Sequence, residues 1–150
     1  MVGRTVSFFA AHKYIVYALF TIITIFTLYL TLIPLRSVPG ISLFEYNKLG
    51  HFLMFFGWTF MLGFSFIIRN NKLAPLFRIF LAGMVFGISI EFAQELLPYG
   101  RTASVWDAAA DVAGSFVAVL LLWGIQTRYQ SYLKPALIKN NINNGNTLES

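Results

Sequence analysis

Cysteine is absent from this chain of 150 residues, and charged residues make up only 11% of it. The lack of cysteine excludes disulfides and thiolate metal sites. The shortage of charge excludes an ordinary soluble domain, because soluble proteins carry about 25% charged residues. Walker A, dinucleotide-binding, HExxH and nucleophile-elbow patterns are absent as well, so function has to be sought outside these signatures.

Hydrophobic residues are abundant, at 57% of the chain, and they include 16 Phe, 7 Tyr and 3 Trp. This composition is typical of an integral membrane protein, whose aromatic side chains face lipid and its interfaces. The formal net charge is +5, but the basic residues stand mostly in short connections between apolar runs. They form no polybasic cluster, so we expect no nucleic-acid partner.

Four apolar segments are long enough to cross a hydrocarbon core of about 30 Å, which takes about 20 helical residues. They are Tyr14 to Leu35, Leu49 to Ile68, Ile79 to Leu97 and Val105 to Ile125. Helices are expected because open strand edges do not survive in lipid. The sequence therefore predicts an all-α, four-helix transmembrane domain over residues 1–125. Residues 126–150 turn polar and are predicted to form a disordered cytoplasmic tail.

The distribution of Lys and Arg predicts the orientation of these helices, because cytoplasmic loops carry the excess of positive charge. If the N-terminus is inside, the inside segments hold Arg4, Lys13, Arg69, Lys72, Arg78, Arg128, Lys134 and Lys139. The outside loops then hold only Arg36, Lys48 and Arg101. We therefore expect a multi-pass protein of the cytoplasmic (inner) membrane with both termini in the cytoplasm.

Polar residues gather near the same, outer end of three predicted helices. They recur at steps of three or four residues and so share one face of each helix: Lys48 and His51 on the second, Glu91, Gln94 and Glu95 on the third, and Ser104, Asp107 and Asp111 on the fourth. At a rise of 1.5 Å per residue, Glu91 and Asp111 both lie about 10 Å from the turn between their helices. Arg101 stands in that turn. The spacing predicts one polar pocket that opens outward.

The charges in this pocket do not balance. Four carboxylates face at most three cations, namely Lys48, Arg101 and a protonated His51. Either one carboxylate is protonated, or an ion is bound, or the pocket recognises a cationic group. A divalent metal is chemically compatible with these side chains, but the spacing matches no metal motif, so the sequence assigns no metal site. The alternative is an ion-pair network that only ties the helices together.

Two further patterns favour structural roles. Thr21, Thr24, Thr27 and Thr31 line one side of the first helix, where we expect them to bond their own backbone or a neighbouring helix. Gly83 with Gly87, and Ala110 with Gly114, form small-xxx-small pairs that are typical of close helix packing. Ser104 is expected to cap the fourth helix.

The polar residues also resemble the VanZ-like family of small membrane proteins. The resemblance runs over about Leu43 to Leu121, through K-x-x-H (Lys48, His51), E-x-x-Q (Glu91, Gln94), P-x-x-R-x-x-S-x-x-D (Pro98, Arg101, Ser104, Asp107) and Gly114. Family members usually carry Asn where Asp111 stands and often Asp where Asn47 stands. The resemblance implies a four-helix membrane protein, and the founding member is linked to low-level resistance to the glycopeptide teicoplanin.

Three functions are compatible with these observations. The first is binding of a lipid-linked envelope precursor or glycopeptide-type ligand at the outer leaflet, in envelope homeostasis or antibiotic tolerance. The second is an enzyme acting on a lipid-linked phosphate or sugar, with His51 or Glu91 as general base, Asp107 as its partner and Arg101 as charge stabiliser. The third is an assembly protein in which the polar residues are structural. Membrane lipids are expected partners, while cofactors and oligomeric state are not predicted.

Overall fold

The computed structural model describes residues 8–9, 11–32, 43–70, 73–97 and 103–145. Within these ranges every long regular element is a helix, and four helices are long and apolar enough to cross a membrane. They are α2 (Lys13–Leu32), α3 (Leu43–Asn70), α4 (Leu76–Leu96) and α5 (Val105–Gly145). The prediction of an all-α chain with four candidate membrane-spanning helices is therefore confirmed.

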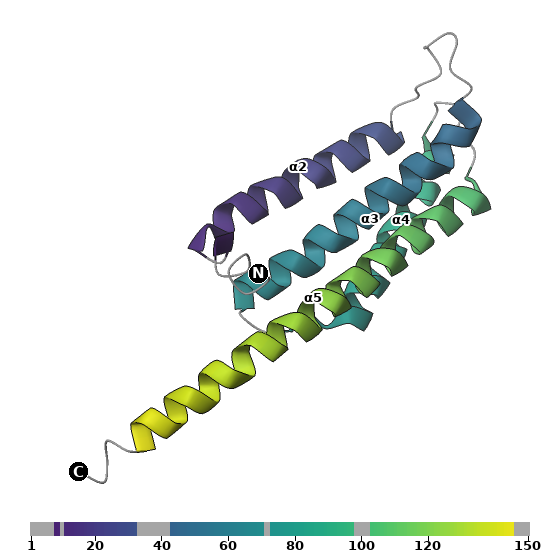
Figure 1. The fold of residues 1–150 in the computed structure, drawn as a ribbon. Helices are drawn as coiled ribbons and strands as arrows, with labels where there is room; N and C mark the ends of the chain where they lie inside the picture. The colour runs from purple at the N-terminus through teal and green to yellow at the C-terminus, as the bar shows by residue number, and fades with distance from the viewer. Residues whose placement is uncertain (1–7, 10, 33–42, 71–72, 98–102, 146–150) are drawn as a thin grey trace.

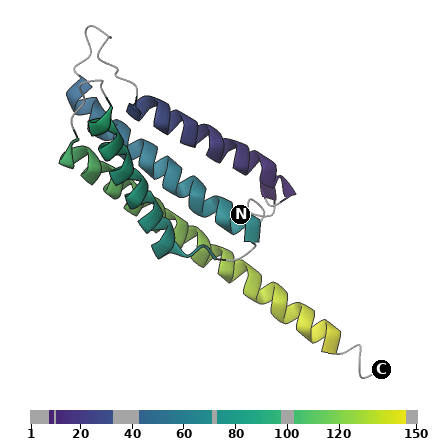
Figure 2. The same ribbon diagram turned by 180° about the vertical axis from the view of Figure 1, so that it is seen from behind.

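The four helices pack side by side, with α3 in contact with each of the other three (Figures 1 and 2). The most extensive contact joins α3 to α5, while α2 packs on α3 and α4. The end of α4 and the start of α5 lie together at one end of the bundle, opposite the start of α2 and the long extension of α5 (Figure 1). This arrangement places the polar ends of α3, α4 and α5 next to one another.

The two faces of α4 show why the helices suit a bilayer. Its inner face buries small, apolar and polar residues: Ile79, Gly83, Gly87, Ile90, Glu91 and Gln94. Its outer face is a stripe of exposed large apolar residues: Phe77, Leu81, Val85, Ile88, Phe92 and Leu96. A helix at the surface of a soluble protein carries charged and polar residues on its outer face. The apolar outer face of α4 is instead suited to lipid tails.

Glycines let the helices approach closely, as their spacing predicts. A Cβ built on Gly83 would lie 2.5 Å from Thr59 Oγ1 and 2.6 Å from Ser115 Oγ, and one on Gly87 would lie 2.9 Å from the Cβ of Asp111. On α5, a Cβ at Gly114 would overlap the main-chain carbonyl oxygen of Phe52. These positions hold α4 and α5 against the central helix, and only glycine fits without displacing a neighbour.

The threonines of α2 behave as expected for hydroxyls in an apolar helix. Thr21, Thr24 and Thr31 donate to the carbonyl oxygens four residues earlier, at distances of 3.0, 2.8 and 2.7 Å. Thr24 also accepts a hydrogen bond of 3.1 Å from the indole N–H of Trp58 on α3. The hydroxyls therefore bond their own backbone, and one of them ties α2 to α3.

The helix ends differ from the predicted ones in two places. α3 begins at Leu43 rather than at residue 49, and α5 continues to Gly145 rather than ending near residue 125. The structure continues α5 as a helix over residues 126–145, and the disordered cytoplasmic tail stays a prediction. Once a helix is nucleated by packing, each further residue that has a backbone N–H can add a hydrogen bond without a new nucleation cost, so a polar composition does not end it.

Candidate functional site

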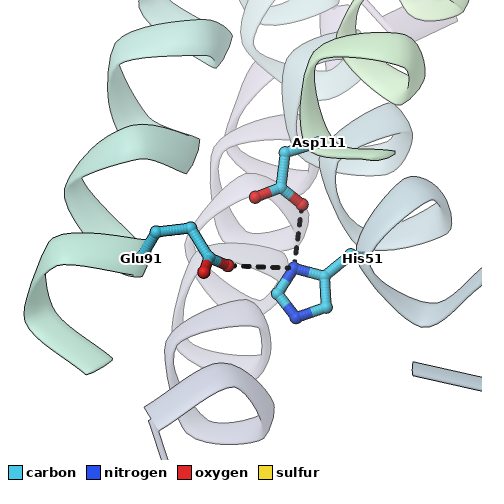
Figure 3. Close-up of side chains that lie close together, drawn as sticks. All are labelled: His51, Glu91 and Asp111. Carbon is cyan, nitrogen blue, oxygen red and sulfur yellow. Dashed lines mark hydrogen bonds and ion pairs between the residues drawn. The ribbon is translucent and has the colours of Figure 1, made fainter. Parts of the chain in front are cut away.

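Three buried ionisable side chains from three helices meet near one end of the bundle (Figure 3). His51 comes from α3, Glu91 from α4 and Asp111 from α5, and we call them the His–Glu–Asp cluster. The Nδ1 atom of His51 lies 2.9 Å from Asp111 Oδ1 and 3.9 Å from Glu91 Oε1. At a rise of 1.5 Å per residue, Asp111 lies about 9 Å below the start of α5. The cluster is thus inside the bundle, but within reach of its end.

Two carboxylate oxygens in this cluster lack a hydrogen bond. Asp111 is fully buried and Glu91 is 5% exposed, yet Asp111 Oδ2 and Glu91 Oε1 have no hydrogen-bond partner among the described residues. Buried polar atoms are normally satisfied, so each exception calls for an explanation. Gly87 contributes to this arrangement, because its missing Cβ leaves room for Asp111 Oδ2, which a Cβ there would approach to 3.1 Å.

Glu91 also fixes the start of α5. Its other oxygen, Oε2, accepts a 2.7 Å hydrogen bond from the backbone N–H of Ser104, and Glu95 accepts one of 2.7 Å from the N–H of Ala103. Ser104 in turn accepts a 3.3 Å hydrogen bond from the N–H of Asp107, which confirms its predicted role as a helix cap. The carboxylate of Glu91 therefore has one structural oxygen and one that points into the cluster.

The other predicted site residues surround the cluster at greater distance. Asp107 is buried one turn before Asp111 on α5. Lys48 is exposed, and its ammonium lies 5.6 Å from the ring centre of Trp106 at the start of α5. Gln94 is buried and donates a 2.8 Å hydrogen bond to the carbonyl of Thr31, so its amide links α4 to α2. Arg101 lies outside the described residues, and its place in the site stays a prediction.

Two buried hydroxyls were not predicted as part of this region. Thr59 on α3 donates a 2.9 Å hydrogen bond to Ser115 on α5, and Gly83 faces both. Ser115 stands four residues after Asp111 on the same face of α5, so extending that face by one turn would have found it. The sequence gives no comparable signal for Thr59, because hydroxyls in apolar helices usually bond their own backbone.

Below these hydroxyls most buried side chains are apolar, and the buried polar exceptions among the described residues are Ser65 and Gln126. Ile67, Ile79 and Leu122 are at most 5% exposed and belong to one cluster that also contains Val16 of α2. A Cβ on Gly63 would meet the side chains of both Leu122 and Ile79, so there is little free space here. The His–Glu–Asp cluster therefore has a largely apolar floor, and the end of the bundle where α4 meets α5 is its nearest route to the surface.

Comparison with known proteins gave no match: no protein family, curated protein or solved structure is detectably similar to this chain. The fold defines an all-helical protein with four helices long and apolar enough to cross a membrane, and with a buried cluster of acidic and imidazole side chains near one end. What this cluster does has to be argued from its own chemistry.

Proposed function

We propose that this chain is a VanZ-like integral protein of the cytoplasmic membrane that binds a lipid-linked or glycopeptide-type envelope ligand at its outer face. The observation that carries the proposal is the burial of His51, Glu91 and Asp111 near one end of four apolar helices. A charge at the centre of a membrane helix costs about 2.5–3.5 kcal/mol on insertion scales, and such residues usually mark substrate or ion pathways. A cost of this size favours a functional role.

The surroundings of the cluster favour a ligand that arrives from one side and carries an apolar chain. The apolar floor argues against a path through the bundle, as a transporter would need. A shallow, open apolar depression between α4 and α5 begins at Val105, at the cluster end of the bundle, and extends to Phe80 and Phe116. An isoprenyl or acyl chain in this depression would leave its headgroup level with the end of the bundle, close to the cluster.

The proposed orientation predicts which end of the bundle is reachable from outside. Because the sequence has no cysteine, single cysteines can be placed without background labelling. Ala103 is exposed beside the start of α5, and Thr127 is exposed more than 20 residues further along the same helix. In intact cells, we expect a membrane-impermeant maleimide to label Ala103→Cys at once and Thr127→Cys only after permeabilisation. The reverse pattern would show that the site faces the cytoplasm.

Ligand binding is tested by native mass spectrometry of protein purified in nanodiscs with and without undecaprenyl phosphate. We expect wild type to retain the polyprenyl lipid in preference to phospholipid. In Asp111→Asn and His51→Gln this preference should fall by a factor of at least about ten, which corresponds to about 1.4 kcal/mol. Ser89→Ala is the control, because the Ser89 hydroxyl is exposed and donates to the carbonyl of Val85 on its own helix. Equal retention of both lipids by wild type would contradict the proposal.

A membrane enzyme is the second candidate, and the His51–Asp111 hydrogen bond is the observation that favours it. A carboxylate that accepts from Nδ1 fixes the imidazole tautomer and leaves Nε2 as the basic nitrogen, as in general-base catalysis. The partner of His51 is Asp111 at 2.9 Å, rather than the predicted Asp107. The nanodisc samples above decide this point as well, because turnover would convert the polyprenyl lipid into a product of different mass.

A further inference from the structure

We propose that the His–Glu–Asp cluster is a binding site for a divalent transition-metal ion of the Zn²⁺ class. The proposal deepens the proposed function, since it names what the cluster itself holds when the ligand binds. It stands on three observations: the donor side chains converge, two of their carboxylate oxygens lack hydrogen bonds among the described residues, and two buried carboxylates share a single imidazole.

The donor atoms are close enough to share one ion. One atom each from His51, Glu91 and Asp111 can be chosen so that all three lie within 4.8 Å of one another. Nδ1 of His51 is 2.9 Å from one carboxylate oxygen and 3.9 Å from the other. Ligands of tetrahedral zinc, at bond lengths of 2.0–2.1 Å, lie about 3.3 Å apart. The observed separations bracket this value, so small rotations of the side chains would complete the site.

The unsatisfied oxygens identify the missing group as a cation. Glu91 Oε1 and Asp111 Oδ2 are buried, have no hydrogen-bond partner among the described residues, and belong to side chains that point toward His51 (Figure 3). A buried carboxylate oxygen is stabilised either by a donor or by a metal. Glu91 keeps its other oxygen on the Ser104 N–H, so it would serve as a ligand through Oε1 without giving up its structural bond.

Charge balance points to an ion with two positive charges. Two buried carboxylates beside a neutral imidazole carry a charge of −2, which a divalent cation cancels. A protonated His51 would cancel only half of it. In a low-dielectric interior, a neutral metal–ligand set costs far less to bury than an excess of anions. The cation thus allows all three ligands to stay in the bundle.

The donor set selects the class of metal. Imidazole nitrogen suits zinc and its neighbours in the first transition row, whereas magnesium and calcium prefer oxygen ligands alone. Three protein ligands leave at least one coordination position open, as in catalytic rather than structural zinc sites. An open position at the cluster would accept a phosphate oxygen of a lipid headgroup, which bare carboxylates would repel.

The experiment is a metal titration of purified protein after treatment with a chelator. We expect one Zn²⁺ per chain by calorimetry, weaker Mn²⁺ binding, and much weaker Mg²⁺ binding, in the order that nitrogen-containing sites show. Zn²⁺ should also raise the thermal unfolding temperature, because an ion that binds only the folded state stabilises it. No saturable Zn²⁺ binding by wild type, or tighter binding of Mg²⁺ than of Zn²⁺, would overturn the inference.

Variants locate the site. Asp111→Asn and His51→Gln should weaken Zn²⁺ binding by more than about 100-fold, since even changes behind a metal ligand cost 10–100-fold. Gly87→Ala should weaken it without removing any donor, because the new Cβ would press on Asp111. The control is Gly57→Ala on α3, where a Cβ meets nothing within 4 Å. If a cluster variant does not fold, the titrations of Gly87→Ala and of wild type still test whether the cluster binds Zn²⁺. Unchanged Zn²⁺ binding by Gly87→Ala and Asp111→Asn would count against this site.

The metal and the lipid ligand are separable. Zn²⁺ is titrated with no polyprenyl lipid present, and lipid retention is measured in chelated and in Zn²⁺-loaded nanodiscs. Lipid retained without any metal binding would overturn this inference and leave the proposed function standing. Metal bound without selective lipid retention would overturn the proposed function and leave the metal site standing. Lipid retention that rises on adding Zn²⁺ supports both.

Discussion

Replacing Gly114 by alanine is expected to lower the free energy of unfolding by about 2–3 kcal/mol, at the upper end of the usual cost of overpacking. The new Cβ would overlap the main-chain carbonyl oxygen of Phe52. A side chain could turn away, but a main-chain oxygen inside a helix moves only if the helix moves. The change therefore forces α3 and α5 apart at their closest approach. SDS titration in mixed micelles, followed by circular dichroism, measures the loss.

Gly124→Ala is the matched control for this change. Gly124 lies on the same helix, ten residues further along, and a Cβ there meets nothing within 4 Å. Alanine is favoured over glycine in a helix by about 0.5–1 kcal/mol, so this variant should be slightly stabilised. If Gly114→Ala and Gly124→Ala behaved alike, the close approach of α3 and α5 would not be what holds the bundle together.

The close packing of α3 on α5 also explains which features of the site could be predicted and which could not. Counting residues from the turn was enough to place Glu91 and Asp111 at equal depth, and the structure brings both beside His51. The sequence could not distinguish Asp107 from Asp111 as the partner of His51, because both lie on one face of α5. Which of them pairs with His51 depends on how α3 and α5 are aligned along their length, which the contact of Gly114 with Phe52 sets.

The number and class of the helices followed from composition, because 20-residue apolar runs have few alternatives in a bilayer. Their ends did not. Polarity marks where a helix leaves the apolar layer, but it does not mark where the helix stops, as the continuation of α5 to Gly145 shows. The Thr59–Ser115 hydrogen bond was missed for a related reason, since single hydroxyls carry no periodic signal.

Replacing both members of the His51–Asp111 pair by apolar residues is expected to cost less stability than replacing either one alone. Each single variant leaves the other member of the pair buried without its partner. Removing one member of a buried ion pair costs about 3–5 kcal/mol. His51→Leu should be the worse of the two, because it leaves the fully buried Asp111 carboxylate without its donor. The double variant His51→Leu with Asp111→Val removes both polar groups and keeps side-chain volumes similar.

A double-mutant cycle in mixed micelles measures the coupling between the two residues. For the double variant to cost less than either single one, the coupling has to exceed the larger single cost. We therefore expect a coupling of about 5 kcal/mol or more, above the usual value of about 0.5–3 kcal/mol for residues in contact. The double variant should then unfold at a higher SDS fraction than either single variant, while losing metal and lipid binding, and the buried Glu91 carboxylate keeps it below wild type. A double variant that loses the sum of both single costs would mean that the cluster serves chiefly to hold the helices together. Recovered stability with lost binding would mean that the bundle does not need these polar groups to fold, and that their burial serves the ligand.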